Sequence, residues 1–306
     1  MTVVEEPAAG VPLAVVSREE IEEKVRQCPR LPSLRSVDSA LRELLNADHR
    51  YTSYVAEVIR RDPSLTARLL RLVNSVYYGL TSPVNSIEEA VFFLGIRQIR
   101  QLAMMTPVIE DFQKLAGHTA FPWREFWRHC IATAILSQEL SGTVRSLPDE
   151  TPYVAGLVHD VGKIVMASAF PAHFAEIQRV AAEGEGDLLE TERAVLGMPH
   201  TEIGAVYLKH HHLPAVLVDA SLCHHAPECA ESDVPMIAVV RLANQLSHAA
   251  RIGMSGNPAV VNESDWLADP SWELVFPAGQ EEERTLARAA LRRKLEHLPL
   301  MLEKMI

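Results

Sequence analysis

Apolar residues recur every three or four positions along most of the chain between residues 17 and 248, which is the period of an α-helix with one buried face. The sustained alternation of apolar and polar positions that a half-buried strand needs is absent. Asp62 and Pro63 are typical of a helix start, and Leu65 and Leu69 begin the apolar stripe that follows them. The pattern therefore predicts an all-α protein in which short helices form a compact bundle.

Glycine and proline residues near most junctions divide this pattern into separate helices. Helices are expected at residues 62–78, at 86–94, from 96 with a kink or an end at Pro107, and at 122–141, 151–169, 172–182, 188–196, 200–209, 215–223, 236–251 and 281–306. Residues 253–280 lack clear periodicity, so we expect a loop or strap there that Trp266 and Trp272 pin to the body. The predicted parts are a flexible N-terminus (1–16), an N-terminal helical subdomain (17–116), a second helical subdomain (122–253) and a C-terminal loop and helix extension (254–306).

The length of 306 residues allows two modest domains, and the charge restricts the partners. The chain carries 29 basic and 40 acidic side chains, a formal charge of −11, whereas duplex nucleic acid attracts proteins of the opposite sign. No apolar run approaches the ~20 residues that cross a bilayer, and Glu5 and Pro7 stand where a secretory signal would be basic and then apolar. We expect a soluble, cytoplasmic protein that contacts neither duplex nucleic acid nor membrane.

The cysteine spacing indicates neither a metal site nor a disulfide framework. Cys28, Cys130, Cys223 and Cys229 contain no CxxC pair, which fits reduced thiols better than a disulfide framework or a zinc ribbon. The conspicuous feature of the composition is instead its 13 histidines.

His129 is the first histidine that the helical pattern turns inward. It shares a face with Phe126, Thr133 and Leu136, so at 3.6 residues per turn it points into the bundle. A single histidine on an apolar face is more often a hydrogen-bonded core residue than a metal ligand. His129 alone therefore leaves both interpretations open.

His159 and Asp160 strengthen the metal interpretation. They stand next to each other in an otherwise apolar stretch that is predicted to be helical, where burying an imidazole and a carboxylate is costly unless a metal or a strong partner receives them. The two oxygens of a carboxylate can also bridge two cations, as in two-metal hydrolases. The pair is a good ligand candidate.

His200 begins a helix after Pro199, and His224 and His225 end another before Pro227. Taken separately, a histidine pair at a helix end is usually a solvated pair whose partial charge complements the last carbonyl groups. The argument for ligation is the whole set. Five imidazoles and one bridging carboxylate suit a transition metal such as Fe, Mn, Zn or Co, with one or two ions, better than Mg²⁺ or Ca²⁺.

The order His129, His159-Asp160, His200 and His224-His225 resembles the HD superfamily of metal-dependent phosphohydrolases, and the full histidine set resembles its HD-GYP branch. A further series of motifs resembles the HDOD family, the HD-related output domain of bacterial signalling proteins. These motifs are Leu31-Pro32-Ser33-Leu34, Asp62-Pro63-Ser64-Leu65-Thr66, Leu70-Arg71-Leu72-Val73-Asn74-Ser75, Tyr78-Gly79, Ser86-Ile87 and Ala90-Val91-Phe92-Phe93-Leu94-Gly95. The resemblance implies an N-terminal helical subdomain packed on an HD-like helical subdomain, and a role in bacterial signalling through protein partners.

The resemblance to HD-GYP enzymes also implies roles for individual residues. His129, His159 and Asp160 would hold one metal, and Asp160 would bridge to a second metal held by the three later histidines, His200, His224 and His225. Lys163 matches the lysine that faces a substrate phosphate, although a helix lysine can equally extend to solvent. Glu125 matches a residue that some members use for an additional metal, and an exposed helix glutamate is the competing interpretation.

Two departures from the family pattern weaken the case for catalysis. Asn244 stands where the HD pattern ends in an aspartate, so its amide oxygen can ligate only weakly and the first metal site loses one negative charge. The GYP segment is also missing, because Ala226-Pro227-Glu228 follows His225. These departures put recognition of a cyclic dinucleotide in the HD-GYP manner in doubt.

Two functions follow from the sequence. The first is a signal-transduction module of the HDOD type that holds one or two metals with little or no turnover. The alternative is a metal-dependent phosphohydrolase or phosphodiesterase acting on a nucleotide, in which Asp160 and Lys163 serve catalysis and a phosphate group is the ligand.

Overall fold

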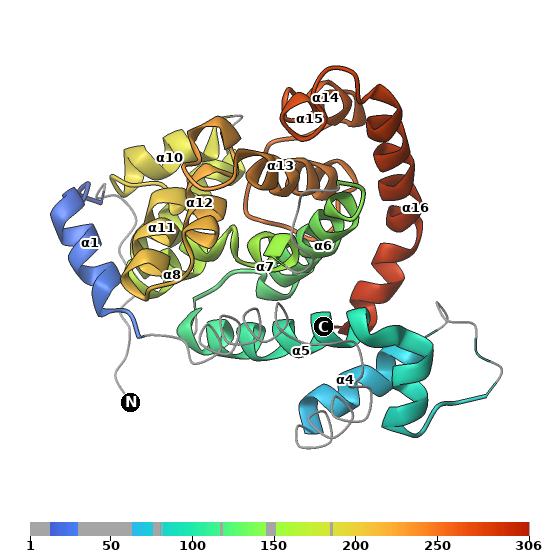
Figure 1. The fold of residues 1–306 in the computed structure, drawn as a ribbon. Helices are drawn as coiled ribbons and strands as arrows, with labels where there is room; N and C mark the ends of the chain where they lie inside the picture. The colour runs from blue at the N-terminus through green and yellow to red at the C-terminus, as the bar shows by residue number, and fades with distance from the viewer. Residues whose placement is uncertain are drawn as a thin grey trace.

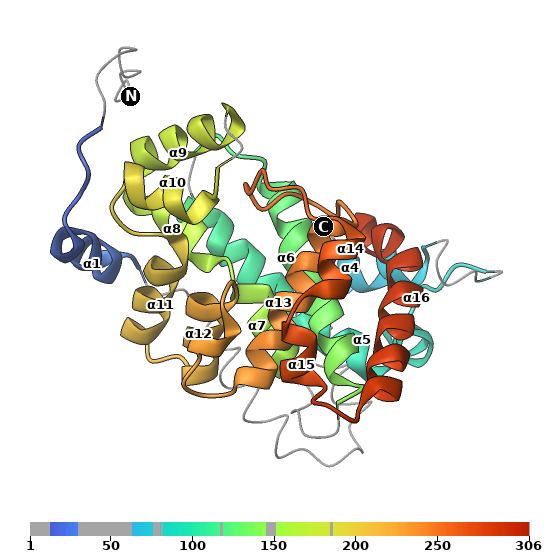
Figure 2. The same cartoon turned by 90° about the horizontal axis from the view of Figure 1, so that it is seen from above.

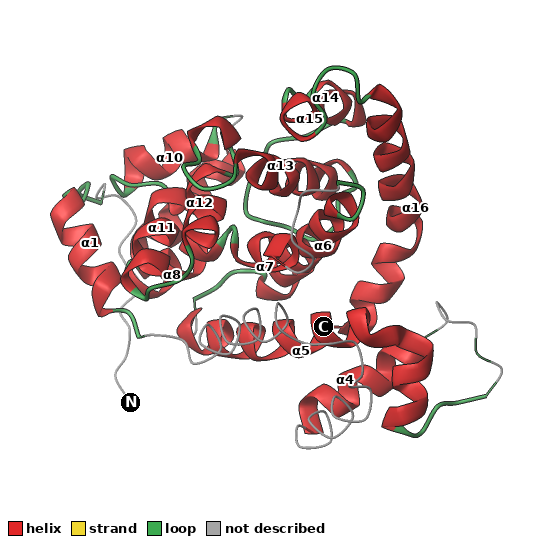
Figure 3. Cartoon of the chain, in the orientation of Figure 1, coloured by secondary structure: helices red, strands yellow, loops and turns green. Residues whose placement is uncertain are grey.

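The computed structural model describes residues 13–29, 63–75, 80, 82–116, 119–144, 151–183 and 186–305. Within these ranges the chain forms α-helices, one short 3-10 helix and no β-strand (Figure 3), so the prediction of an all-α fold is confirmed. Most of the segment predicted to be a flexible N-terminus, the motif at 31–34 and the helix start at Asp62 lie outside the described residues. None of the helices described here combines the length and apolar character that crossing a bilayer requires.

Helix α6 (Trp123–Ser141) is the centre of the bundle. Nearly its whole surface is buried, because α7 (Thr151–Val158), α13 (Val234–Ala249) and the C-terminal α16 (Glu281–Met305) pack around it (Figures 1 and 2). The approach of α7 requires Gly156, since a Cβ atom there would lie 2.8 Å from the backbone of Ala134. This close packing holds α6 and α7 in fixed relation.

A second group of helices lies beside this centre. Helix α11 (His200–His210) packs between α8 (Val161–Ala169) and α12 (Ala215–Cys223), and α9 (Pro171–Glu183) and α10 (Leu188–Val195) pack together at the edge (Figure 2). Gly162 allows the contact between α8 and α11, because a Cβ atom there would meet the backbone oxygen of His200 at 1.8 Å. The start of α11 is thereby held against the start of α8.

The expectation of one helix over residues 151–169 is wrong. The chain turns at His159 and Asp160, which separate α7 from α8. Asp160 has φ −97° and ψ 14° and stands at the N-terminal boundary of α8. The two side chains therefore lie at a junction between buried helices rather than on the face of one helix.

The N-terminal part of the chain contributes to two places. Helix α1 (Arg18–Gln27) is capped by Ser17 and packs against α11 and α8. By contrast, α4 (Pro63–Val73) packs on α5 (Ile87–Ala116), which runs beneath α6, α7 and α8 (Figure 1). The helical geometry of α5 is interrupted at Gly95, whose φ is 73°, a value that glycine adopts readily. This is the position at which the sequence predicts a helix end. The helix continues through Pro107 to Ala116.

The C-terminal extension packs closely on the body. The expectation that residues 253–280 are loop is wrong in part, because α14 (Glu263–Ala268) and α15 (Ser271–Val275) form within it. The predicted pinning by tryptophan is confirmed: Trp266 and Trp272 are fully buried, and the Trp266 indole N–H donates to the carbonyl of Leu242 in α13. From there α16 runs along the molecule and packs on both α6 and α4 (Figure 1).

The expectation of four reduced cysteines is also wrong. Cys223 and Cys229 form a disulfide, whereas Cys28 and Cys130 are free and buried. The pairing depends on tertiary geometry, because α12 ends at Cys223 and a short 3-10 helix (Pro227–Cys229) returns Cys229 to within 5.8 Å between Cα atoms.

Candidate metal centre

The structure brings one set of three predicted ligands together at the junction of α6, α7 and α8. His129, on α6, and the pair His159 and Asp160 each offer a donor atom within 4.8 Å of the others. All three side chains are buried. We call this set the inner cluster.

A second set of three lies next to it. His200 comes from the first residue of α11, and His224 and His225 follow the last turn of α12. Their donor atoms also lie within 4.8 Å of one another. His224 is buried, whereas His225 is only partly buried. We call this set the outer cluster.

Asp160 connects the two clusters. Its Oδ1 atom lies 3.2 Å from Nε2 of His200 and 3.6 Å from Nε2 of His224, while its Oδ2 atom lies 3.5 Å from Nε2 of His159. One oxygen therefore faces the outer cluster and the other faces the inner cluster. This is the arrangement that a carboxylate bridging two cations requires.

Hydrogen bonds to backbone carbonyl groups fix the orientation of two imidazoles, those of His159 and His224. Nδ1 of His159 lies 2.8 Å from the carbonyl oxygen of Gly156, and Nδ1 of His224 lies 3.0 Å from those of Ala220 and Ser221. Carbonyl oxygens only accept, so each Nδ1 carries the proton and each Nε2 presents a lone pair. Metal-binding histidines in proteins are usually held in this way.

Glu192, on α10, supports His200, and the sequence analysis missed it. Its carboxylate lies 2.7 Å from Nδ1 of His200 and also accepts the backbone N–H of His200 at 2.8 Å. Glu192 is buried. The available signal was its position one turn from both Leu188 and Leu196, on the apolar face of the helix, where a glutamate needs a partner.

The atoms that face the centre have no hydrogen-bond partner among the described residues. They are both ring nitrogens of His129, Nε2 of His159, His200, His224 and His225, Oδ1 of Asp160 and Oδ1 of Asn244. Buried polar atoms without partners are costly, and these atoms share one location rather than being scattered. A bound cation would satisfy them together.

The electrostatics favour the protonation states that metal ligands need in all of these groups except His200. Burial lowers the pKa of His129, His224 and His225 well below that of a free imidazole. Burial opposes ionisation of Asp160, but Lys163 and the neighbouring histidines outweigh it and hold its pKa well below the usual range. His200 differs, because Glu192 and Asp160 overcome the effect of burial and raise its pKa.

The remaining predicted residues, Lys163, Asn244 and Glu125, differ in their burial. Lys163 does not extend to solvent: it is buried and its Nζ donates to Oδ2 of Asp160 at 2.8 Å. Asn244, on α13, is buried, and its Oδ1 atom has no hydrogen-bond partner among the described residues. Glu125 lies outside both clusters, with a side chain that is 43% exposed and 3.7 Å from Arg128. His248, one turn after Asn244 and not predicted, lies against His129 with ring centres 4.6 Å apart.

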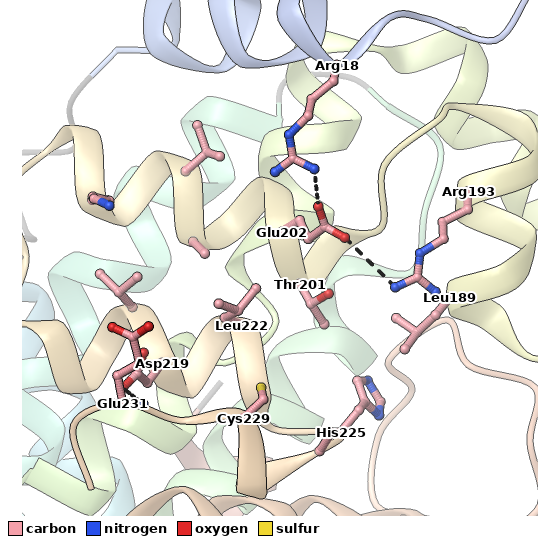
Figure 4. Close-up of a pocket in the computed structure, with 15 residues that line it drawn as sticks. Arg18, Leu189, Arg193, Thr201, Glu202, Asp219, Leu222, His225, Cys229 and Glu231 are labelled. Atoms are coloured by element: carbon pink, nitrogen blue, oxygen red, sulfur yellow. Dashed lines mark hydrogen bonds and ion pairs between the residues drawn. The ribbon is translucent and has the colours of Figure 1, made fainter. Parts of the chain in front are cut away.

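The outer cluster adjoins an open pocket, and no residue of the inner cluster lines that pocket. The pocket has a volume of about 590 Å³ and lies between α1, α10, α11 and α12, with His225 in its wall (Figure 4). Arg18 and Arg193 stand at its rim, both near the carboxylate of Glu202. A molecule in this pocket could reach the outer cluster through His225.

A family model for the HDOD domain matches residues 31–227. The chain belongs to the HDOD family. The match includes all six residues of the inner and outer clusters and ends two residues after His225. Asn244 and His248, on α13, lie beyond the HDOD match, as do the C-terminal helices.

Solved structures of other proteins have a fold similar to that of this HDOD chain. An HDOD domain protein of unknown function from Geobacter sulfurreducens superposes with a TM-score of 0.77 at 24% identity, covering 95% of this chain and 99% of that one. A candidate phosphohydrolase from Shewanella amazonensis SB2B has a TM-score of 0.60 at 25% identity, covering 93% and 96%.

A curated relative is longer than this HDOD chain. It is an uncharacterized protein of Treponema pallidum (strain Nichols), 28% identical over 228 residues, which are 73% of this chain and 43% of that protein. The chain therefore spans less than half the length of the curated relative it matches.

Proposed function

We propose that this protein is a cytoplasmic bacterial signal-transduction module that holds one or two transition-metal ions between its helices and contacts protein partners, with little or no turnover. The observation that carries the proposal is the convergence of unpartnered, buried donor atoms on the two oxygens of Asp160. These atoms come from α6, from the start of α11, from the end of α12 and from the junction of α7 with α8. Nitrogen donors in this number favour Fe, Mn, Zn or Co over Mg²⁺ or Ca²⁺.

The ligand assignment follows the two clusters. His129, His159 and Asp160 would hold the inner ion, with Asn244 as a weak neutral neighbour. His200, His224 and His225 would hold the outer ion together with the second oxygen of Asp160. Because these residues come from α6, α11 and α12 and from the junctions beside them, bound metal would stabilise the packing of the bundle.

The alternative function is a metal-dependent phosphohydrolase or phosphodiesterase that acts on a nucleotide. A bound metal pair would supply Lewis acidity toward a phosphate group. Lys163 and the pocket at His225 favour this candidate, since a buried cation beside Asp160 could help to hold an anionic oxygen. The candidate phosphohydrolase among the similar structures gives it further support. The neutral Asn244 argues against it by weakening the inner site.

Elemental analysis of the purified protein tests the first proposal, with wild type and His159→Ala measured side by side. We expect stoichiometric metal in the wild type and a loss of at least the inner ion in the variant. Assays on a cyclic dinucleotide and on a generic phosphodiester should show no turnover in either protein. Metal-free wild type would refute the ligand assignment, and metal-dependent turnover that His159→Ala abolishes would favour the phosphohydrolase.

A further inference from the structure

The Cys223–Cys229 disulfide closes the segment that carries two of the three outer ligands. Cys223 is the last residue of α12, His224 and His225 follow it directly, and Cys229 ends the short 3-10 helix after them. The bond therefore joins both ends of a loop whose first two residues are His224 and His225. Breaking this bond would therefore affect the segment with His224 and His225 more directly than the other ligands.

The two sulfur atoms differ in access. Cys223 is fully buried, whereas Cys229 is exposed and lines the same pocket as His225 (Figure 4). A small dithiol or a peroxide can therefore approach Cys229 through the pocket, while Cys223 is protected from direct attack. This asymmetry is typical of a reactive cysteine with a buried partner.

The rest of the loop has other attachments, so breaking the bond would not unfold it. The side chain of Arg241 donates to the backbone oxygen of His225 and pairs with Asp269 at 2.9 Å. The carboxylate of Asp219 accepts the backbone N–H groups of Glu231 and Ser232 at 3.1 and 2.8 Å. These contacts hold the loop at His225 and just beyond Cys229, but none of them fixes the His225 ring.

His224 is better protected than His225. Two carbonyl oxygens of α12 hold its Nδ1, and the ring is buried. Without the disulfide, His225 loses the restraint that closes its loop, whereas His224 keeps its contacts to the helix. The inner cluster comes from α6 and from the junction of α7 with α8, and it shares no residue with this loop.

We propose that Cys223 and Cys229 form a reversible redox modification site that sets the metal affinity of the outer cluster. The inference rests on the proposed function, since it requires that the outer cluster bind metal. In the disulfide form the loop presents His225 beside His200 and His224. In the dithiol form the loop is freer and the outer ion is bound more weakly, while the inner ion is unaffected.

The chemistry needs one dithiol and one oxidant. A thiolate of the dithiol attacks the sulfur of Cys229, forms a mixed disulfide with it and releases Cys223, which is protonated to the thiol. The second thiol of the reductant then attacks its own sulfur in the mixed disulfide and releases Cys229. The reductant leaves as a cyclic disulfide, and two electrons have passed to the protein. Hydrogen peroxide reverses the step. It oxidises the thiolate of Cys229 to a sulfenic acid with loss of one oxygen as water, and the thiol of Cys223 displaces the second oxygen, also as water.

The test compares Mn²⁺ binding to the metal-free full chain in its oxidised and reduced forms. Mn²⁺ is suitable because thiolates bind it poorly, so the freed cysteines do not become competing ligands. Each form is freed of reductant or peroxide, its thiols are counted by alkylation and mass spectrometry, and Mn²⁺ is titrated with detection by electron paramagnetic resonance. His225→Ala identifies which bound ion belongs to the outer cluster.

We expect two alkylated cysteines in the oxidised form, four in the reduced form, and about tenfold weaker binding of the outer ion after reduction, the size of effect seen when ligand orientation is lost. Cys223→Ser with Cys229→Ser should bind like the reduced form under both conditions. The matched control, Cys28→Ala with Cys130→Ala, should keep the redox response. Equal affinities in the two forms, or peroxide treatment that fails to link Cys223 to Cys229, would overturn this inference alone. No Mn²⁺ binding in either form would overturn the proposed function as well.

Discussion

The inner and outer clusters use the same residue types in different surroundings. The inner cluster is sealed within α6, α7 and α8 and its histidines are supported by few polar contacts, since both ring nitrogens of His129 lack a hydrogen-bond partner among the described residues. The outer cluster has a buried carboxylate behind His200 and an open pocket beside His225. A bound ion would therefore be shielded from solvent at the inner cluster, whereas molecules in the pocket could change the affinity for an ion at the outer cluster.

The largest expected effect comes from the residue that both clusters share. Asp160→Asn removes the bridging charge and leaves Lys163 buried beside a neutral amide. We expect bound metal to fall below ~0.1 ion per chain and the free energy of unfolding of the metal-free protein to fall by about 3 kcal/mol. Elemental analysis and urea unfolding measure the two effects. Glu125→Gln is the matched control and should leave both unchanged; metal retained in Asp160→Asn would contradict the bridging role.

Glu192→Gln should separate the two clusters. The amide oxygen carries no full negative charge, so it accepts from the imidazole of His200 more weakly than the carboxylate does, and the ring loses basicity. We expect the outer ion to bind roughly 10- to 100-fold more weakly, while the affinity for the inner ion stays the same. Calorimetric titration with two resolved binding events measures this, and equal weakening of both events would show that the clusters act as one site.

Asn244→Asp should strengthen the inner cluster. A carboxylate in place of the amide restores the charge that the HD pattern carries, and we expect about tenfold tighter binding of the inner ion. Asn244→Ala is the companion variant, and it should weaken binding only slightly. If the affinity for the inner ion did not change in Asn244→Asp, residue 244 would not be a neighbour of that ion.

The metal-free protein should lose stability on mild acidification. The pKa values of His129, His224 and His225 lie well below the ordinary value and that of His248 lies at about 4, so these rings stay neutral in the folded chain while they protonate in the unfolded chain below its pKa of about 6.5. Their effect therefore lowers stability as the pH falls from 7.5 to 5. His200 acts in the opposite direction, because its raised pKa favours the folded state at the lower pH.

Burial also lowers the pKa of His159. Because five lowered values outweigh one raised value, we expect the Tm of the metal-free protein to fall by about 5 °C between pH 7.5 and pH 5.5. Thermal unfolding followed by circular dichroism measures it. The companion variant His129→Gln should show a smaller fall. A Tm that is flat or rises on acidification would mean that these imidazoles are solvated or already charged in the folded chain.

Much of the fold could be predicted from the helical spacing of apolar residues and from the Gly or Pro residues near most helix junctions. The limits of α12 were predicted as observed, and those of α6 to within one residue. The break at His159 and Asp160 could not be found in this way, since no proline marks it and the surrounding residues remain apolar on all sides. Gly162, two residues after Asp160, packs against the backbone of α11, and such a tertiary contact cannot be found from periodicity.

The candidate site was predicted as a list of residues, and its internal connections were not. The sequence indicated the five histidines and Asp160, and the structure brings these six together. Glu192 and His248 were missed because each belongs to a helix whose partner could be known only from the three-dimensional arrangement. The disulfide was missed for a related reason, since a spacing of six residues implies pairing only when the intervening loop turns back.

Helix α16 connects two parts of the molecule. It packs on α6, which carries His129, and also on α4, which belongs to the N-terminal helices. A partner that shifted α4 would therefore push or pull on the helix that holds the inner cluster without touching the cluster itself. The last helix of the chain thus connects α4 to the helix that carries His129, and a displacement of α4 would be transmitted to the inner cluster through that connection.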